Sequence, residues 1–220
     1  MTQRLAPREP GPHAFPRARG VAFAWLLLWA PAYARGYGWA NFLHLCDLAV
    51  ILTCLGFWLG SPLLLSMQAL SSLVIDVAWD LDLAFKALTG GHLIGGTEYM
   101  WDARFPLGLR LLSLFHVVGP PLVWWAVRRV GYDRRALVAQ ALFAVVVLAA
   151  SRVVLPAANI NFAQGDPFTG RSWGPAPVHL GLTAIALVGL IYAPTHALLR
   201  RMMPRPRNRP DASRSAAAGG

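Results

Sequence analysis

Long uncharged apolar runs follow one another along most of the chain, separated by short polar or basic segments. A helix needs about 20 apolar residues to cross the hydrocarbon core of a bilayer, and most of these runs approach that length. The pattern predicts an all-α fold, a polytopic membrane bundle of six transmembrane helices. The expected helices cover residues 21–34, 39–60, 62–88, 106–127, 136–156 and 176–199.

The pattern also divides the chain into three parts. Residues 1–20 are rich in Pro and Arg and are predicted to form a disordered cytoplasmic tail. Residues 21–200 hold the six-helix transmembrane domain, and residues 201–220 are predicted to form a second disordered cytoplasmic tail. Basic residues, a short apolar run and the small residues of Ala32-Tyr33-Ala34 are also typical of a cleaved signal peptide. We favour an uncleaved first helix because the preceding tail is long.

Composition and charge support the membrane assignment. Apolar residues make up 56% of the chain and charged residues only 14%, against about a quarter in a globular domain. The formal charge of +10 does not indicate nucleic-acid binding, because Lys and Arg gather beside the predicted helices. With both termini inside, the inner side receives 14 of the 20 basic residues, as is typical of cytoplasmic segments. The predicted location is therefore the inner membrane of the cell, crossed several times.

The two cysteines, Cys46 and Cys54, are eight residues apart in one predicted helix. They would lie about 12 Å from each other, too far for a disulfide within that helix. No Cys-x-x-Cys or similar ligand spacing occurs, so we expect neither a metal site nor a cofactor.

Polar residues in four predicted helices fall at one depth, in the outer half of the bundle. An Asp at a helix centre costs about 2.5–3.5 kcal/mol on insertion scales, so such residues are expected to face protein or water rather than lipid. The residues concerned are Cys46, Asp76, Asp80, Asp82, His116, Asn159 and Asn161.

Helix 62–88 carries three of these groups. Asp76 and Asp80 are four residues apart and share a face, whereas Asp82 lies on the opposite side. Lys86 follows Asp82 by four residues, which predicts a salt bridge between them. For Asp82, a structural role and a functional role stay equally open.

Cys46 and His116 have a chemical logic as a pair. A thiolate is a strong nucleophile, and a neighbouring His promotes its formation at neutral pH. Such a pair attacks an ester and forms a thioester. The simpler alternatives are that Cys46 is a small buried apolar residue and that His116 joins two helices by a hydrogen bond.

Several short motifs resemble those of a known family. The stretches LHLCDLA (43–49), FHVVGPPL (115–122), AANINFAQGDPF (157–168), GPAPVHL (174–180) and IYAPTH (191–196) occur in the order found in YwaF-type bacterial integral membrane proteins. That family is similar to the eukaryotic transmembrane protein 164 family. The resemblance implies six transmembrane helices and transfer of a fatty acyl group between phospholipids by a Cys and a His. The matching positions are Cys46 and His116.

Other parts of the family pattern match less closely. The family's Asn-Tyr stretch falls on Asn161 and Phe162, and its Gly-Pro-Trp-Pro stretch falls on residues 174–177, where Ala176 replaces Trp. Phe115 stands where the family often has Ser, and a Gly follows the His by three residues.

Together these observations predict a phospholipid acyltransferase that uses Cys46 as nucleophile and His116 as general base. Asp80 or Asn161 is expected to orient the imidazole or to hold the ester carbonyl, and membrane lipids are the expected substrates. The alternatives are a lipid hydrolase of related mechanism, a small proton- or cation-coupled transporter that uses Asp76 and Asp80, and a non-catalytic partner protein in the membrane.

Overall fold

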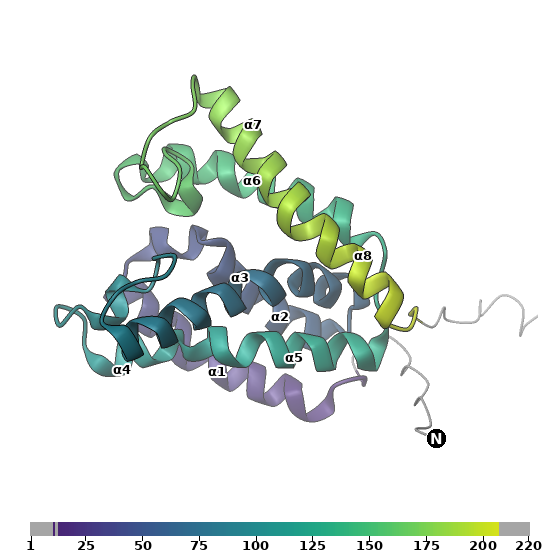
Figure 1. The fold of residues 1–220 in the computed structure, drawn as a ribbon. Helices are drawn as coiled ribbons and strands as arrows, with labels where there is room; N and C mark the ends of the chain where they lie inside the picture. The colour runs from purple at the N-terminus through teal and green to yellow at the C-terminus, as the bar shows by residue number, and fades with distance from the viewer. Residues whose placement is uncertain (1–10, 12, 207–220) are drawn as a thin grey trace, which may run out of the picture.

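The computed structural model describes residues 11 and 13–206, and within them the chain is all-α. Residues 1–10, 12 and 207–220 of the two predicted tails lie outside the described residues. The long helical rods run roughly alongside one another, and the start of the first and the end of the last lie at the same end of the bundle (Figure 1).

Within the described residues, four helical rods are long and apolar enough to cross a membrane, by length and composition. They are α3 (Pro62–Thr89), the rod Leu107–Val130, α6 (Ala136–Val154) and the rod Ala176–Met202. The helix α2 (Leu45–Leu59) is apolar but has only 15 residues. The remaining helix, α1 (Pro16–Gly36), has 21 residues but does not meet the same standard of apolarity.

Two of the rods join several helical segments. The first combines α4 (Leu107–Leu111), the 3₁₀ turn η3 (Leu112–Leu114) and α5 (Phe115–Val130). The second combines α7 (Ala176–Ala186), the π-helical turn η6 (Leu187–Tyr192) and α8 (Ala193–Met202). A proline cannot donate the usual helical hydrogen bond, and the π turn just before Pro194 lets the rod continue through it.

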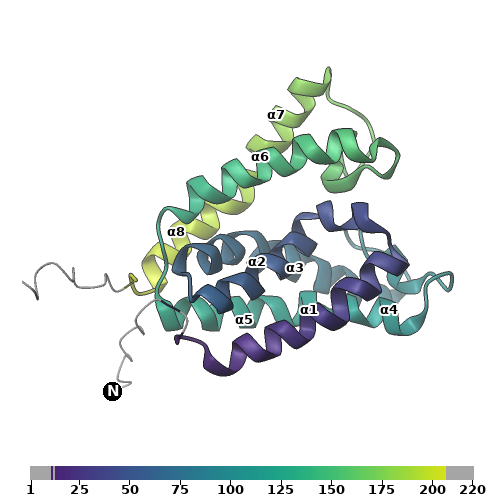
Figure 2. The same cartoon turned by 180° about the vertical axis from the view of Figure 1, so that it is seen from behind.

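Helix α3 is the centre of the bundle. Ser61 caps its first turn by accepting a hydrogen bond from the Leu64 amide, and Pro62 occupies the first turn, where no donor is needed. Gly90 ends the helix in a left-handed conformation with φ of 78°. Helices α2, α5 and α6 pack against α3, and α1 covers α2. The pair formed by α6 and α7–α8 meets the other helices near α8 and diverges from them toward α7 (Figure 2).

Most predicted helix bounds lie within three residues of the observed ones. The starts of α1 and α2 differ by more than that, and each difference has a physical reason. Helix α1 begins at Pro16, five residues before the predicted start. Just before it, Phe15 is 1% exposed and packs edge-on against Phe57, so part of the predicted tail belongs to the core. At the other end, α8 continues to Met202 and Met203 is buried, so the predicted second tail also begins inside the fold.

The predicted helix 39–60 is broken near its start. Residues Trp39–Leu43 form the 3₁₀ turn η1, and His44 is extended, with φ of −60° and ψ of 133°. Helix α2 starts anew at Leu45 because the Asn161 side chain accepts a hydrogen bond from the Leu45 amide. The thiol-bearing Cys46 therefore stands in the first turn of a helix.

Candidate functional site

A buried carboxylate–imidazole pair joins the middle of α3 to the first turn of α5. The Nδ1 atom of His116 lies 2.9 Å from Oδ1 of Asp76, and both residues are less than 5% exposed. The indole of Trp79 stacks on the imidazole, with ring centroids 4.5 Å apart and planes at 22°. Two neighbours on α3, one turn of helix apart, thus fix both the direction and the plane of the His116 ring.

The hydrogen bond to Asp76 also indicates which ring nitrogen of His116 carries the hydrogen. A carboxylate accepts from Nδ1–H, which leaves Nε2 of His116 as the atom with the free lone pair. Within the described residues, Nε2 makes no hydrogen bond. An imidazole held in this way can act as a general base through Nε2.

Gly119 permits the close approach of α5 to the Asp76 carboxylate. A Cβ atom at position 119 would lie 2.9 Å from Oδ2 of Asp76, closer than non-bonded atoms normally come. Gly119 therefore has a local structural reason, since it sits one turn after His116 and leaves room for the Asp76 carboxylate.

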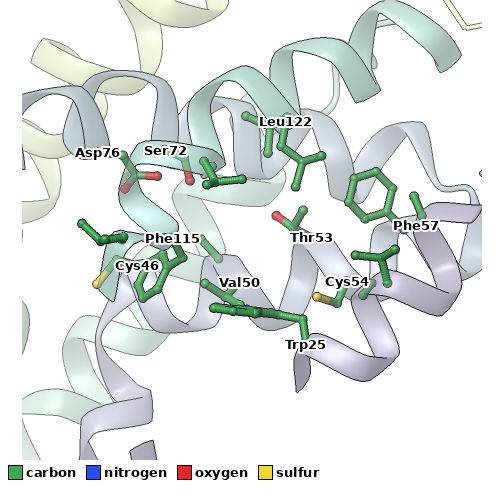
Figure 3. A pocket seen from close by; sticks show the side chains of 18 of the residues that line it. Trp25, Cys46, Val50, Thr53, Cys54, Phe57, Ser72, Asp76, Phe115 and Leu122 are labelled. Atoms are coloured by element: carbon green, nitrogen blue, oxygen red, sulfur yellow. The ribbon is translucent and has the colours of Figure 1, made fainter. Parts of the chain in front are cut away.

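Beside this pair lies a cavity of about 470 Å³ between α1, α2, α3 and α5. Cys46, Ser72 and Asp76 line one end of it, and Cys54 and Phe57 line the other, with Trp25, Val50 and Thr53 between (Figure 3). Almost all of the remaining lining is aliphatic or aromatic. The cavity thus has one polar end, which carries the thiol and the carboxylate, and one apolar end.

Cys46 is held at the polar end by contacts of its neighbours. The Asn161 amide nitrogen donates to the Leu43 carbonyl at 2.7 Å and to Ser151 Oγ at 2.9 Å. Asn41 donates to the buried carboxylate of Asp47, the residue that follows Cys46. Cys46 itself is a free cysteine, not part of a disulfide.

Asp80 lies one turn beyond Asp76 on α3, and its Oδ1 atom is buried without a hydrogen-bond partner. Among the described residues, Asp76, and neither Asp80 nor Asn161, makes the hydrogen bond that orients the His116 imidazole. The alternative expectation, that Asp80 or Asn161 holds an ester carbonyl, stays a prediction. Gln68, Ser72, Asp76 and Asp80 follow each other at every fourth position, which makes a polar stripe along one side of α3.

Asp82 organises a loop and is remote from the cavity lining. Its Oδ1 accepts from the amides of residues 93–95, at 2.7–2.9 Å, and its Oδ2 accepts from Thr97 and His92. The predicted salt bridge to Lys86 is wrong, because Lys86 donates to the Gly90 carbonyl at the end of α3. These contacts favour the structural role of Asp82.

Asn159 and Asn161 belong to the connection between α6 and α7, with the 3₁₀ turns η4 (Pro156–Ala158) and η5 (Ile160–Phe162). Both have positive φ, 47° and 54°, a conformation that Asn tolerates better than most residues. Asn159 Oδ1 accepts from the amides of Gln164 and Gly165, and so shapes the loop. Asn161 links this loop to η1 and α2, so it supports the site without lining the cavity.

The sequence did not single out Trp79 or the Asp76–His116 contact. Trp79 follows Asp76 by three residues, a spacing that places both on one face of α3. Which residue of α5 they meet depends on how α3 and α5 are rotated against each other. Within the described residues, no group of three His, Cys, Asp or Glu side chains could hold a metal ion.

Comparisons of the chain with protein families, with curated proteins and with solved structures gave no match. A function for this chain therefore has to be argued from the geometry of the cavity and of the residues around it.

Proposed function

We propose that the protein is an integral membrane enzyme that transfers acyl groups between lipids through a Cys46 thioester. One observation carries the proposal: a mostly apolar cavity has at one end both a free thiol and Asp76, the carboxylate that binds His116. Apolar walls suit a lipid tail, and the polar end suits ester chemistry. The motif resemblance to the YwaF-type family leads to the same activity.

The proposed topology has six spans, with α1 and α2 crossing beside the four long apolar rods. Six crossings place both termini on one side, and the helices 16–36 and 176–202 begin and end at the same end of the bundle (Figure 1). The distribution of basic residues makes that side the cytoplasm. The polar end of the cavity then lies toward the outer leaflet of the inner membrane.

In the first step of the mechanism, Nε2 of His116 takes the thiol proton while Sγ of Cys46 attacks the ester carbonyl carbon. A C–S bond forms, the ester C–O bond breaks, and the imidazolium returns the proton to the departing lipid alcohol. Asp76 keeps the ring oriented and stabilises its positive charge during this exchange. Ser72 lines the same end of the cavity, beside Cys46 and Asp76.

In the second step, His116 removes a proton from the hydroxyl of an acceptor lipid, whose oxygen attacks the thioester. The C–O bond forms, the C–S bond breaks, and the thiol regains its proton. An apolar cavity excludes water and so favours a lipid hydroxyl as acceptor. If water takes the place of the hydroxyl, the same residues perform lipid hydrolysis, which is the nearest alternative.

The test compares two cysteines of the same helix. Purified wild type, Cys46→Ala and Cys54→Ala are incubated in liposomes with a phospholipid that carries a labelled acyl chain. We expect wild type and Cys54→Ala to transfer the label and to gain the acyl mass as a hydroxylamine-sensitive adduct on Cys46, whereas Cys46→Ala does neither. Equal turnover by Cys46→Ala would refute the proposal. Labelled free fatty acid instead of labelled lipid would assign hydrolysis.

A second candidate function is suggested by the polar stripe on α3. Its end members, Gln68 and Asp80, each keep a buried polar atom without a partner, as expected where water enters a helix bundle. This observation favours proton or cation transport along α3. Flux in proteoliposomes that Asp76→Asn abolishes and Cys46→Ala spares would support transport over acyl transfer.

A further inference from the structure

The cavity has the shape of a slot for one acyl chain of limited length. Along α2 its lining runs from Cys46 to Phe57, which corresponds to roughly 16 Å at the helical rise per residue. Its volume of about 470 Å³ lies within the usual range for pockets that hold small molecules. Figure 3 shows the two sulfur atoms near opposite ends and Thr53 between them.

The apolar end of the cavity is closed by aromatic side chains. Phe57 is 2% exposed, and its ring lies 6.2 Å from that of Trp125, which lines the same end. Phe15 packs behind both, with ring centroids 5.0 Å from Phe57 and 5.5 Å from Trp125. Phe15 and Phe57 are buried and packed against each other, so they make a fixed floor, and Trp125, which is 43% exposed, forms its outer edge.

The cavity is open on the side of α1 and α5. Val21 on α1 and Val118 on α5 line it and are 70% and 58% exposed, and Leu111 on α4 is 48% exposed. Exposed aliphatic side chains on a membrane helix face lipid tails. A lipid can therefore place one tail into the cavity from the side, without passing through water.

From this geometry we infer that the cavity binds one acyl chain, with the ester beside Cys46 and the chain end against Phe57, and that the Phe57–Trp125 floor limits chain length. The ester of the bound chain lies at the polar end, because burying an ester carbonyl at the apolar end would cost the free energy of its lost hydrogen bonds. At about 1.3 Å of advance per carbon, from C–C bonds of roughly 1.5 Å in a zigzag, a 16 Å slot holds about 12 carbons. The inference rests on the proposed function, whose ester it places.

Cys54 provides a reporter that does not depend on catalysis. It lines the apolar end, is 5% exposed, and becomes the only cysteine of the chain in the Cys46→Ala variant. Its position eight residues after Cys46 puts it about 12 Å along the slot, beyond the reach of an eight-carbon chain but within the reach of a twelve-carbon chain.

The experiment measures the rate at which N-ethylmaleimide modifies Cys54 in Cys46→Ala protein held in amphipol. Methyl esters of octanoic, dodecanoic and hexadecanoic acid are supplied from cyclodextrin. We expect the twelve-carbon ester to slow labelling at least tenfold and the eight-carbon ester to change it less than twofold. The sixteen-carbon ester should protect less than the twelve-carbon ester, because the floor leaves no room for about four of its carbons when its ester lies beside Cys46. Equal protection by the twelve- and sixteen-carbon esters would overturn the length limit. Equal protection by all three esters, or by none, would overturn the inference, as would a Cys54 that labels only after denaturation.

Two matched variants test the slot by a second measurement. Thr53→Phe places a ring about two-thirds of the way along the cavity, roughly 10 Å from Cys46 along α2. Leu55→Phe places one on the side of α2 where Leu55 is 42% exposed and does not line the cavity. Native mass spectrometry, with Cys46→Ala as background, should find the twelve-carbon ester bound to Leu55→Phe protein and lost from Thr53→Phe protein. Retention of this ester by both variants would contradict the slot.

The outcomes separate the two proposals. If the twelve-carbon ester protects Cys54 while Cys46→Ala still transfers acyl groups, the slot stands and the Cys46 mechanism fails. If turnover requires Cys46 but no ester protects Cys54, the mechanism stands and the slot fails.

Discussion

Gly119 offers the sharpest test of how α5 meets the Asp76 carboxylate. In Gly119→Ala, the new methyl group would lie 2.9 Å from Oδ2 of Asp76, where ordinary contact between non-bonded atoms begins at about 3.5 Å. The carboxylate has to move by about 0.6 Å, but its other oxygen is held at 2.9 Å from His116. Along the bond, a shift of this size would lengthen it from 2.9 Å to about 3.5 Å, beyond the usual upper limit of about 3.2 Å.

The expected cost is that of overpacking a well-filled site, about 1–3 kcal/mol in the free energy of unfolding. The assay is reversible unfolding in mixed detergent micelles, followed by circular dichroism. Gly181→Ala on α7 is the control, because nothing lies within 4 Å of a Cβ atom there. It should raise stability by about 0.4–1 kcal/mol, since alanine has less chain entropy to lose than glycine.

Pro120 adds an effect of its own to this measurement. Position 119 precedes the proline, and an alanine before proline is disfavoured in a helix whatever Asp76 does. A double-mutant cycle with Asp76→Ala isolates the carboxylate contact, because the proline effect is the same in both backgrounds. We expect Gly119→Ala to cost at least about 1 kcal/mol less when Asp76 is absent. Equal costs in the two backgrounds would refute the described approach of α5 to Asp76.

The remaining predictions concern catalysis, the α2 start and an exposed loop. His116→Gln should lower kcat for acyl transfer by about 10²–10⁴-fold with little change in KM, and unchanged kcat would remove the imidazole from the mechanism. Asn161→Gly keeps the positive φ but loses three side-chain hydrogen bonds, so it should lower the free energy of unfolding by about 1.5–4 kcal/mol. Asn161→Ala should lower it further, because a residue with a Cβ atom disfavours a φ of 54°. Hydrogen bonds from the side chain and amide of Thr169 lower the pKa of Asp166 to about 2. Since the folded pKa lies below the ordinary value of 3.8, the stabilising contribution of Asp166 is complete above about pH 4 and is lost as the pH falls through 2. Carboxyl carbon shifts in a pH titration should show this low pKa and a rise of it in Thr169→Val, and an ordinary pKa in the wild type would contradict the loop contacts.

The helices could be predicted from the sequence because a run of about 20 apolar residues leaves few alternatives to a helix. The break at His44 could not, because it depends on the side chain of Asn161, which is more than a hundred residues away. Sequence alone also could not tell where the core begins: Phe15 lies in a Pro- and Arg-rich stretch typical of a tail, yet it completes an aromatic cluster with Phe57.

The candidate site could be predicted in its residue types but not in its pairings. Helical spacing put Asp76 and Asp80 on one face, yet only the rotation of α3 against α5 decides which of them meets His116. The opposite face of α3 carried Asp82, whose preference for the amides of residues 93–95 over Lys86 depends on how the following loop folds back.

The polar stripe on α3 has a consequence for the order in which the chain is assembled. Asp76 is satisfied by a histidine that the ribosome adds 40 residues later, so α3 alone would leave its carboxylate in hydrocarbon. We therefore expect α3 to enter the bilayer together with α5 rather than alone. Chains that stop between Thr89 and Leu107 would lack the histidine and should insert α3 less efficiently.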